Sequence, residues 1–174
     1  MGHLNVEIKA KCNNQDIIRE ILKSKQADFK GVDHQIDTYF KTNSGRLKLR
    51  EGNIENSLIF YERENKEGPK QSNVILFRTI KDSSLKEILI KLFEILTVVD
   101  KRREIYFIDN VKFHIDSVNR LGKFVEIEAI DYNGNIGRTK LLEQCQEYIN
   151  LLDIKPEDLV SKSYSDMLLE ISKT

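Results

Sequence analysis

Charged and apolar residues alternate with a period of two in several short segments of the chain, and this pattern predicts β-strands. Residues 6–11 and 46–50 are clear cases, because a charge occupies every second position and Val, Ile, Leu or Ala occupies the others. Such a strand has one ionic face and one apolar face. With the turn residues between segments, the pattern predicts these strands: Leu4–Cys12, Gln35–Lys41, Arg46–Glu51, Leu58–Arg63, Val74–Ile80, Val98–Ile108, Val111–Val118 and Lys123–Asp131.

Apolar residues recur at helical spacing in other parts of the chain. The second of these helices is expected to begin near Ser84, with a stripe that includes Ile88, Leu92 and Leu96. The others are expected from about Asn14, over Thr139–Leu152 and over Ser163–Ile171.

Gly and Pro residues mark the breaks between these elements. Residues 64–73 contain Gly68 and Pro69 and predict a flexible loop. The turn chemistry of residues 43–45 and of Asp109–Asn110 predicts hairpins. No repeat or linker divides the chain, so we expect one α+β domain over residues 1–174.

The alternation alone does not say whether the ionic faces look at water or into a cavity. An antiparallel sheet commonly solvates one face, which is the default for any single strand. However, Arg46, Lys48 and Arg50 share one face, as do Glu126 and Glu128, and like charges at such spacing invite a ligand of opposite sign. A closed antiparallel eight-stranded β-barrel with helices packed outside would turn all these charges into a tunnel.

Composition excludes several classes of partner. The 28 basic and 28 acidic side chains cancel, so no overall field attracts nucleic acid. No apolar run reaches about 18 residues, so no membrane-spanning segment is expected. The two cysteines are far apart in sequence, which favours a reduced, cytoplasmic protein.

Candidate chemistry follows from the signs of the charges. Basic residues come from several predicted strands, whereas carboxylates come from the first strand and from one of the last. Lys and Arg pair with phosphate, and carboxylate oxygens are ligands for hard divalent cations. The sequence therefore predicts a polyanion site that also holds a metal ion.

The same segments resemble those of a known family, the CYTH family of triphosphate tunnel metalloenzymes, in its branch similar to class IV adenylyl cyclases and thiamine triphosphatases. The resemblance covers nearly the whole chain. The segments that carry it, in order, are Asn5-Val-Glu7-Ile-Lys9-Ala-Lys11, Gln35-Ile-Asp-Thr-Tyr39-Phe, Gly45-Arg-Leu-Lys-Leu-Arg50-Glu, Leu58–Arg63 with Gly68-Pro-Lys70, Lys101-Arg-Arg103-Glu, His114-Ile-Asp116 and Leu121-Gly-Lys-Phe-Val-Glu126-Ile-Glu128.

The resemblance implies a closed eight-stranded tunnel, a small-molecule triphosphate substrate, and Mg²⁺ or Mn²⁺ as cofactor. It places Glu7, Glu126 and Glu128 at the metal and in catalysis, together with Asp116 as a further catalytic residue. Asn5 stands where the family signature has its first acidic residue, so this position can ligate a metal but supplies no charge. The implied substrate-binding residues are Lys9, Lys11, Arg46, Lys48, Arg50, Arg63, Lys101 and Arg103.

Three functions fit these expectations. The first is hydrolysis of tripolyphosphate, thiamine triphosphate or a nucleoside triphosphate, which needs only the phosphate site and the metal. The second is an adenylyl cyclase, which would also need a place for adenine, and no such element is visible in the sequence. The third is a non-catalytic polyphosphate or nucleotide binder, supported by Asn5. The sequence leaves the oligomeric state open, including a homodimer.

Overall fold

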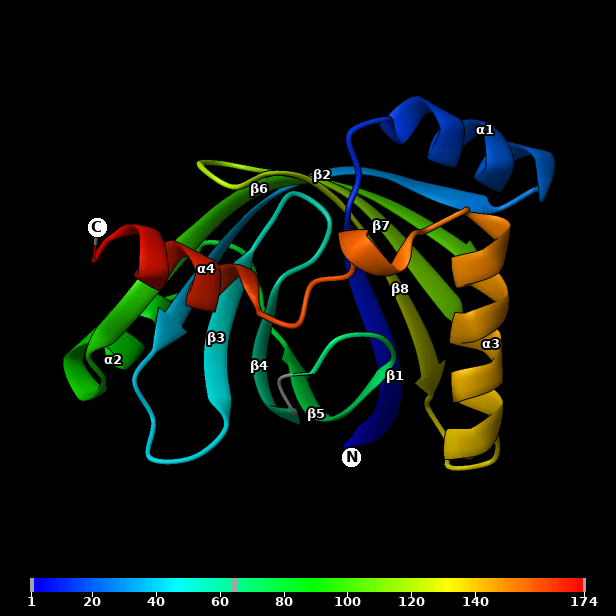
Figure 1. The fold of residues 1–174 in the computed structure, drawn as a ribbon. Helices are drawn as coiled ribbons and strands as arrows, with labels where there is room; N and C mark the ends of the chain where they lie inside the picture. The colour runs from blue at the N-terminus through cyan, green and yellow to red at the C-terminus, as the bar shows by residue number, and fades with distance from the viewer. Residues whose placement is uncertain (1, 64–65, 174) are drawn as a thin grey trace.

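The computed structural model describes residues 2–63 and 66–173. Helices separate three groups of strands along the chain, and a short 3₁₀ turn at Pro156–Asp158 precedes the last helix (Figure 1). The elements are β1 (His3–Lys11), α1 (Gln15–Ser24), β2 (Asp28–Phe40), β3 (Arg46–Glu51), β4 (Ser57–Arg63), β5 (Lys70–Arg78), α2 (Leu85–Leu92), β6 (Ile95–Ile108), β7 (Val111–Val118), β8 (Gly122–Asp131), α3 (Arg138–Leu151) and α4 (Tyr164–Ile171).

The eight strands close into an antiparallel barrel in the order β1-β5-β4-β3-β2-β6-β7-β8. β1 closes it, because it pairs with β5 on one side and with β8 on the other. The expectation of a closed α+β barrel with external helices is confirmed. None of the helices in the described part of the chain has the length and hydropathy of a membrane span.

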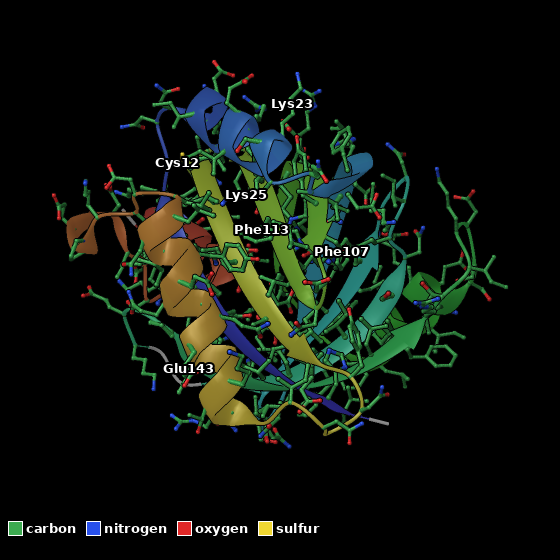
Figure 2. The ribbon with its side chains drawn as sticks, turned by 90° about the vertical axis from the view of Figure 1, so that its right-hand side faces the viewer. Cys12, Lys23, Lys25, Phe107, Phe113 and Glu143 are labelled. Carbon is green, nitrogen blue, oxygen red and sulfur yellow. The ribbon has the colours of Figure 1, made fainter. Side chains whose placement is uncertain are left out.

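The hydrophobic core lies outside the barrel, between strands and helices. The outward residues of β1, β7 and β8, such as Ile8, Phe113 and Ile127, are buried against α1 and α3. Figure 2 shows Phe113 on the side of the sheet that α3 covers, where its ring meets Tyr148 edge-on at 4.7 Å between ring centroids. Because these apolar side chains turn outward, the alternate residues of the same strands must point into the barrel.

α4 closes one end of the tunnel. Its Tyr164 and Leu168 pack against the inward residues Tyr39 and Phe124 (Figure 1, red helix). The helix begins with a capping box, in which Ser163 Oγ accepts the backbone N–H of Asp166 and the Asp166 carboxylate accepts the backbone N–H of Ser163. This cap fixes where the helix starts and therefore where Tyr164 points.

Many boundaries differ from the sequence-based expectation by one or a few residues, and three differences change the description of an element. The predicted loop at 64–73 is wrong for its last four residues, because β5 already begins at Lys70, directly after Pro69; residues 64–65 lie outside the described residues. The second helix ends at Leu92, and Leu96 belongs to β6 rather than to the helical stripe. β2 starts at Asp28, earlier than its alternation suggested, because a register shift between Phe29 and Gly31 breaks the period.

Candidate active site in the tunnel

The barrel encloses a cavity of about 700 Å³ lined by side chains from all eight strands. The inward positions are those that the alternation assigned to the ionic faces. The predicted site residues that line this cavity are Glu7, Lys9, Lys48, Arg50, Arg63, Lys101, Arg103, Glu126 and Glu128.

Three predicted site residues do not line the cavity. Lys11 is exposed at the last position of β1. Arg46 forms an ion pair with Asp166 of α4, with 2.9 Å between Nη2 and Oδ2. Asp116 is fully buried and accepts hydrogen bonds from Arg103 and Tyr164, so it can influence a ligand only through these two cavity-lining side chains. The structure therefore does not bring these three side chains into the cavity with the other predicted site residues.

Asp37 organises the first group of cations. Its carboxylate accepts from Lys48 Nζ at 2.9 Å, from Lys101 Nζ at 2.7 Å and from Arg50 Nε at 2.9 Å. Burial alone would raise the pKa of Asp37, but the charges of Arg50, Lys101 and Lys48 hold it well below its usual value. Burial also lowers the pKa of Lys101 to about 7, although Asp37 opposes this shift. These cations are therefore held in place by a fixed anion before any ligand binds.

Arg103 organises a second group. It donates from Nε to Asp116 Oδ1 at 2.7 Å and from Nη2 to Glu126 Oε2 at 2.6 Å. Tyr164 of α4 donates its hydroxyl to Asp116 at 2.7 Å. Burial would raise the pKa of Glu126, but the charges of Arg103 and Lys9 hold it well below its usual value. Glu126 is therefore an ionised carboxylate.

His114 also contacts Glu126, with 3.1 Å between Nδ1 and Oε2. Burial lowers the pKa of His114 to about 3, and the charge of Arg103 contributes to this shift. The imidazole is therefore neutral and donates one hydrogen bond to Glu126. This fits the structural role that is usual for a buried histidine beside a carboxylate.

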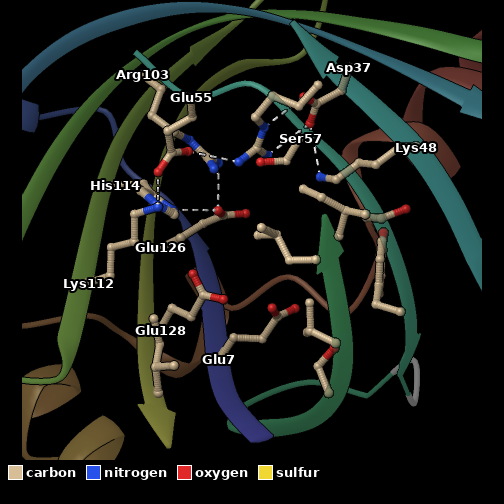
Figure 3. A pocket seen from close by; sticks show the side chains of 18 of the residues that line it. Glu7, Asp37, Lys48, Glu55, Ser57, Arg103, Lys112, His114, Glu126 and Glu128 are labelled. Carbon is tan, nitrogen blue, oxygen red and sulfur yellow. Dashed lines mark hydrogen bonds and ion pairs between the residues drawn. The ribbon is translucent and has the colours of Figure 1, made fainter. Parts of the chain in front are cut away.

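Glu7 and Glu128 form an acidic corner on neighbouring strands. They are opposite each other in the β1–β8 register, and Figure 3 shows both carboxylates in the lumen beside one another. Burial raises the pKa of Glu128 to about 7, and the charges of Glu7 and Glu126 add to this shift. The Asn5 side-chain amide donates to Glu128, whereas its Oδ1 is buried and accepts no hydrogen bond within the described chain.

These donors suit a hard divalent cation. Two carboxylates that repel each other and an amide oxygen without a partner are the oxygen ligands that Mg²⁺ or Mn²⁺ takes. As they stand, no three His, Cys, Asp or Glu side chains of the described residues are grouped to hold a metal ion. Glu7 is turned to Arg63 and Glu126 to Arg103. The donor chemistry fits a metal, provided that these carboxylates exchange their cationic partners for it.

Because burial of the Glu128 carboxylate is unfavourable, Glu128→Gln should stabilise the protein in EDTA at pH 8. The raised pKa means that wild-type stability is retained below the usual pKa and is lost as the pH rises towards 7. We expect a gain of about 2 kcal/mol in unfolding free energy at pH 8 and a small gain at pH 5, measured by urea unfolding. An equal gain at both pH values would contradict the raised pKa.

Arg63 is the cation with the most unused hydrogen-bonding capacity. It donates from Nη1 to Glu7, but its Nε and Nη2 are buried and donate to no acceptor among residues 2–63 and 66–173. Buried donors without partners are rare in proteins and are costly. An anion in the tunnel would satisfy them.

Sequence reasoning missed several residues of the tunnel. Asp37 and Lys112 lie on inward positions of strands that were predicted, so their parity could have indicated them. Lys70, which we expected on a mobile loop, is buried on β5 and donates to the backbone oxygens of Val160 and Ser161 at 2.9 and 3.1 Å. Glu55 comes from the β3–β4 loop, where no periodicity exists to indicate a direction.

Comparisons with known proteins agree with this architecture. A protein of Methanocaldococcus jannaschii, provisionally named an adenylate cyclase, is 28% identical. The alignment, 180 residues long with its gaps, covers 94% of this chain and 98% of that protein. The solved structure of a conserved protein from Pyrococcus furiosus has a TM-score of 0.78 and 26% identity, and the match covers 93% of this chain and 98% of the other.

A more distant structure has the same fold. A Hippeastrum protein, described provisionally as an adenylyl cyclase and as having a dominant triphosphatase activity, has a TM-score of 0.63 and 12% identity, over 99% of this chain and 96% of the other. Residues 3–164 match the family described as the CYTH domain. With the closed barrel and its charged lumen, this match shows that the chain belongs to the CYTH domain family.

Proposed function

We propose that the protein is a divalent-metal-dependent enzyme that hydrolyses a linear triphosphate inside the tunnel. The observation that carries this proposal is the division of the lumen into a cation-lined wall and an acidic corner (Figure 3). A triphosphate carries about four negative charges, and a closed barrel strips its water, so fixed cations must replace that water. Lys48, Arg63 and Lys9 are the cations best placed to do so.

The proposed roles follow from position. Arg63 and the lysines bind the phosphate chain and hold it in line, which supplies most of the catalysis in phosphoryl transfer. Glu7, Glu126 and Glu128 hold Mg²⁺ or Mn²⁺, with Asn5 as a neutral ligand. The metal, when bound, neutralises charge on the reacting phosphoryl group. A water molecule attacks the terminal phosphorus, the bridging P–O bond breaks, and orthophosphate and the shortened chain leave.

An adenylyl cyclase is the second candidate, and the provisional name of the archaeal relative favours it. In that reaction the ribose 3′-hydroxyl attacks the α-phosphorus and pyrophosphate leaves. The dominant triphosphatase activity ascribed to the Hippeastrum protein favours the hydrolase. Non-catalytic binding of polyphosphate or a nucleotide is the third candidate and rests on Asn5.

A substrate screen separates these functions. The purified protein is incubated with tripolyphosphate, thiamine triphosphate or ATP, each with Mg²⁺ or Mn²⁺. Orthophosphate release is the expected result. Formation of cyclic AMP and pyrophosphate from ATP would establish an adenylyl cyclase. Tight binding of a triphosphate without any product would identify a non-catalytic binding protein.

Lys48→Ala should weaken tripolyphosphate binding on the order of ten-fold, because one charge-assisted contact to the phosphates is lost. Lys48 lines the cavity, whereas Lys86 pairs with Glu51 on the outer side of β3. Lys86→Ala is therefore the matched control and should bind with wild-type affinity. Titration calorimetry measures both. Equal affinity of the two variants would place the phosphate site elsewhere.

A further inference from the structure

Glu55 is an acidic side chain that enters the tunnel from a loop. It lies between β3 and β4, yet its carboxylate accepts from Arg50 Nη1 at 3.0 Å, from Gln35 Nε2 at 3.1 Å and from Lys112. Figure 3 shows Glu55 in the lumen among the other cavity-lining side chains. Two of these partners are cations of the cavity wall. A protein carboxylate therefore occupies the place where an anionic ligand would meet Arg50 and Lys112.

The loop is built to hold Glu55 in this place. The fully buried Asp33 accepts the backbone N–H groups of Asn53, Ile54 and Glu55 at 2.6, 2.9 and 2.9 Å. At Gly52, a Cβ atom would lie 2.7 Å from both Asp33 carboxylate oxygens, so this close approach requires glycine. The backbone hydrogen bonds to Asp33 therefore fix the position of Glu55 in the loop.

Glu55 differs from Asp37 in how firmly it is held. Asp37 is 1% exposed, bonds three cations and lies on a strand, so it stays with the cationic wall. The Glu55 side chain is 25% exposed and has a path to solvent. Rotation of its side chain can release Arg50 and Lys112 without movement of a strand. Arg50 retains Asp37 after such a rotation. Lys112, in contrast, loses its ion pair and keeps Glu128, which lies opposite it in the β7–β8 register.

We propose that Glu55 is a built-in competitor of the anionic ligand, which occupies Arg50 and Lys112 in the free protein and yields them to a polyphosphate. Glu55 thereby sets the affinity of the tunnel and helps to expel the product when it returns to these cations. The inference rests on the proposed function only in that a polyphosphate binds in the lumen. In this proposal Glu55 changes the affinity for the polyphosphate and is not a ligand of the metal ion.

The test compares Glu55→Gln with Glu51→Gln in tripolyphosphate binding. Glu51 is the matched control. Like Glu55 it comes shortly after Arg50 in the sequence and forms an ion pair, but its partner is Lys86, outside the barrel. Calorimetry in EDTA excludes turnover. Loss of one charged competitor is expected to tighten the dissociation constant of Glu55→Gln on the order of ten-fold. Glu51→Gln should match the wild type, and Lys112→Gln should bind more weakly.

Each outcome is decisive. Affinity of Glu55→Gln equal to or weaker than that of the wild type, with an unchanged melting temperature, would overturn the competitor role. The proposed function is tested separately, by orthophosphate release with Mg²⁺ or Mn²⁺. Turnover by the wild type together with an unchanged affinity of Glu55→Gln overturns the competitor role alone, whereas no turnover and no tripolyphosphate binding in the presence of the metal would overturn the proposed function as well. If the Gln variant does not fold, Glu55→Ser carries the same expectation, because it also removes the charge.

Discussion

Glu126→Gln is expected to lower triphosphate turnover by about 100-fold or more while the protein still binds tripolyphosphate. Glu126 is the carboxylate at which Arg103, Lys9 and His114 meet. The amide oxygen can still accept from Arg103 and His114, but the amide nitrogen cannot accept from Lys9, and the side chain no longer supplies the charge that a metal ion needs. Removal of one preorganised electrostatic contact from a catalytic site typically lowers the turnover rate by about 10²-fold to 10³-fold.

Phosphate release and calorimetric binding, measured on the same preparation, separate the two effects. Glu104→Gln serves as the control, because Glu104 is partly buried and ion-paired to Arg19 on the outer side of β6. The control should retain turnover. Undiminished turnover in Glu126→Gln would remove Glu126 from the metal site and from catalysis.

Asp37→Asn is expected to destabilise the free protein by about 3–5 kcal/mol. The change leaves Lys48, Arg50 and Lys101 in the barrel without the carboxylate that holds them, and an uncompensated buried charge has a cost of this size. In a chain of this length the melting temperature should fall by roughly 10 °C. Tripolyphosphate should recover much of this loss, because it supplies the missing negative charge.

Differential scanning fluorimetry with and without tripolyphosphate measures this effect. Asp100→Asn is the control, since Asp100 pairs with His34 on the exposed side of β6. Its melting temperature should stay close to that of the wild type. If tripolyphosphate does not raise the lowered melting temperature of Asp37→Asn, the cations released from Asp37 do not face the ligand.

The barrel could be predicted from the sequence because its strands alternate ionic residues on one face with apolar residues on the other. β3 and β7 have the predicted bounds, Arg46–Glu51 and Val111–Val118. The ionic residues of these strands point inward because helices cover the apolar sides, α1 and α3 over β7 and α2 over β3. Alternation fixes which residues share a face, and the need of the helices for an apolar surface fixes which face is inside.

The ion pairing in the lumen could not be predicted in the same way. Alternation placed Arg50 and Lys101 on inward faces but could not show that Asp37 binds both. That contact depends on the barrel register, in which β2 lies between β3 and β6. Glu55 required knowledge of a loop that Asp33 shapes through backbone hydrogen bonds. Local periodicity contains no information about either.

A crystal structure with tripolyphosphate and Mn²⁺ bound tests the central claim most directly, because anomalous scattering locates the metal. We predict the phosphate chain in the lumen against Lys48 and Arg63, with the metal between the chain and the carboxylates of Glu7 and Glu128. Phosphate or metal bound only on the outer surface of the barrel, with the lumen ion pairs unchanged, would contradict the account.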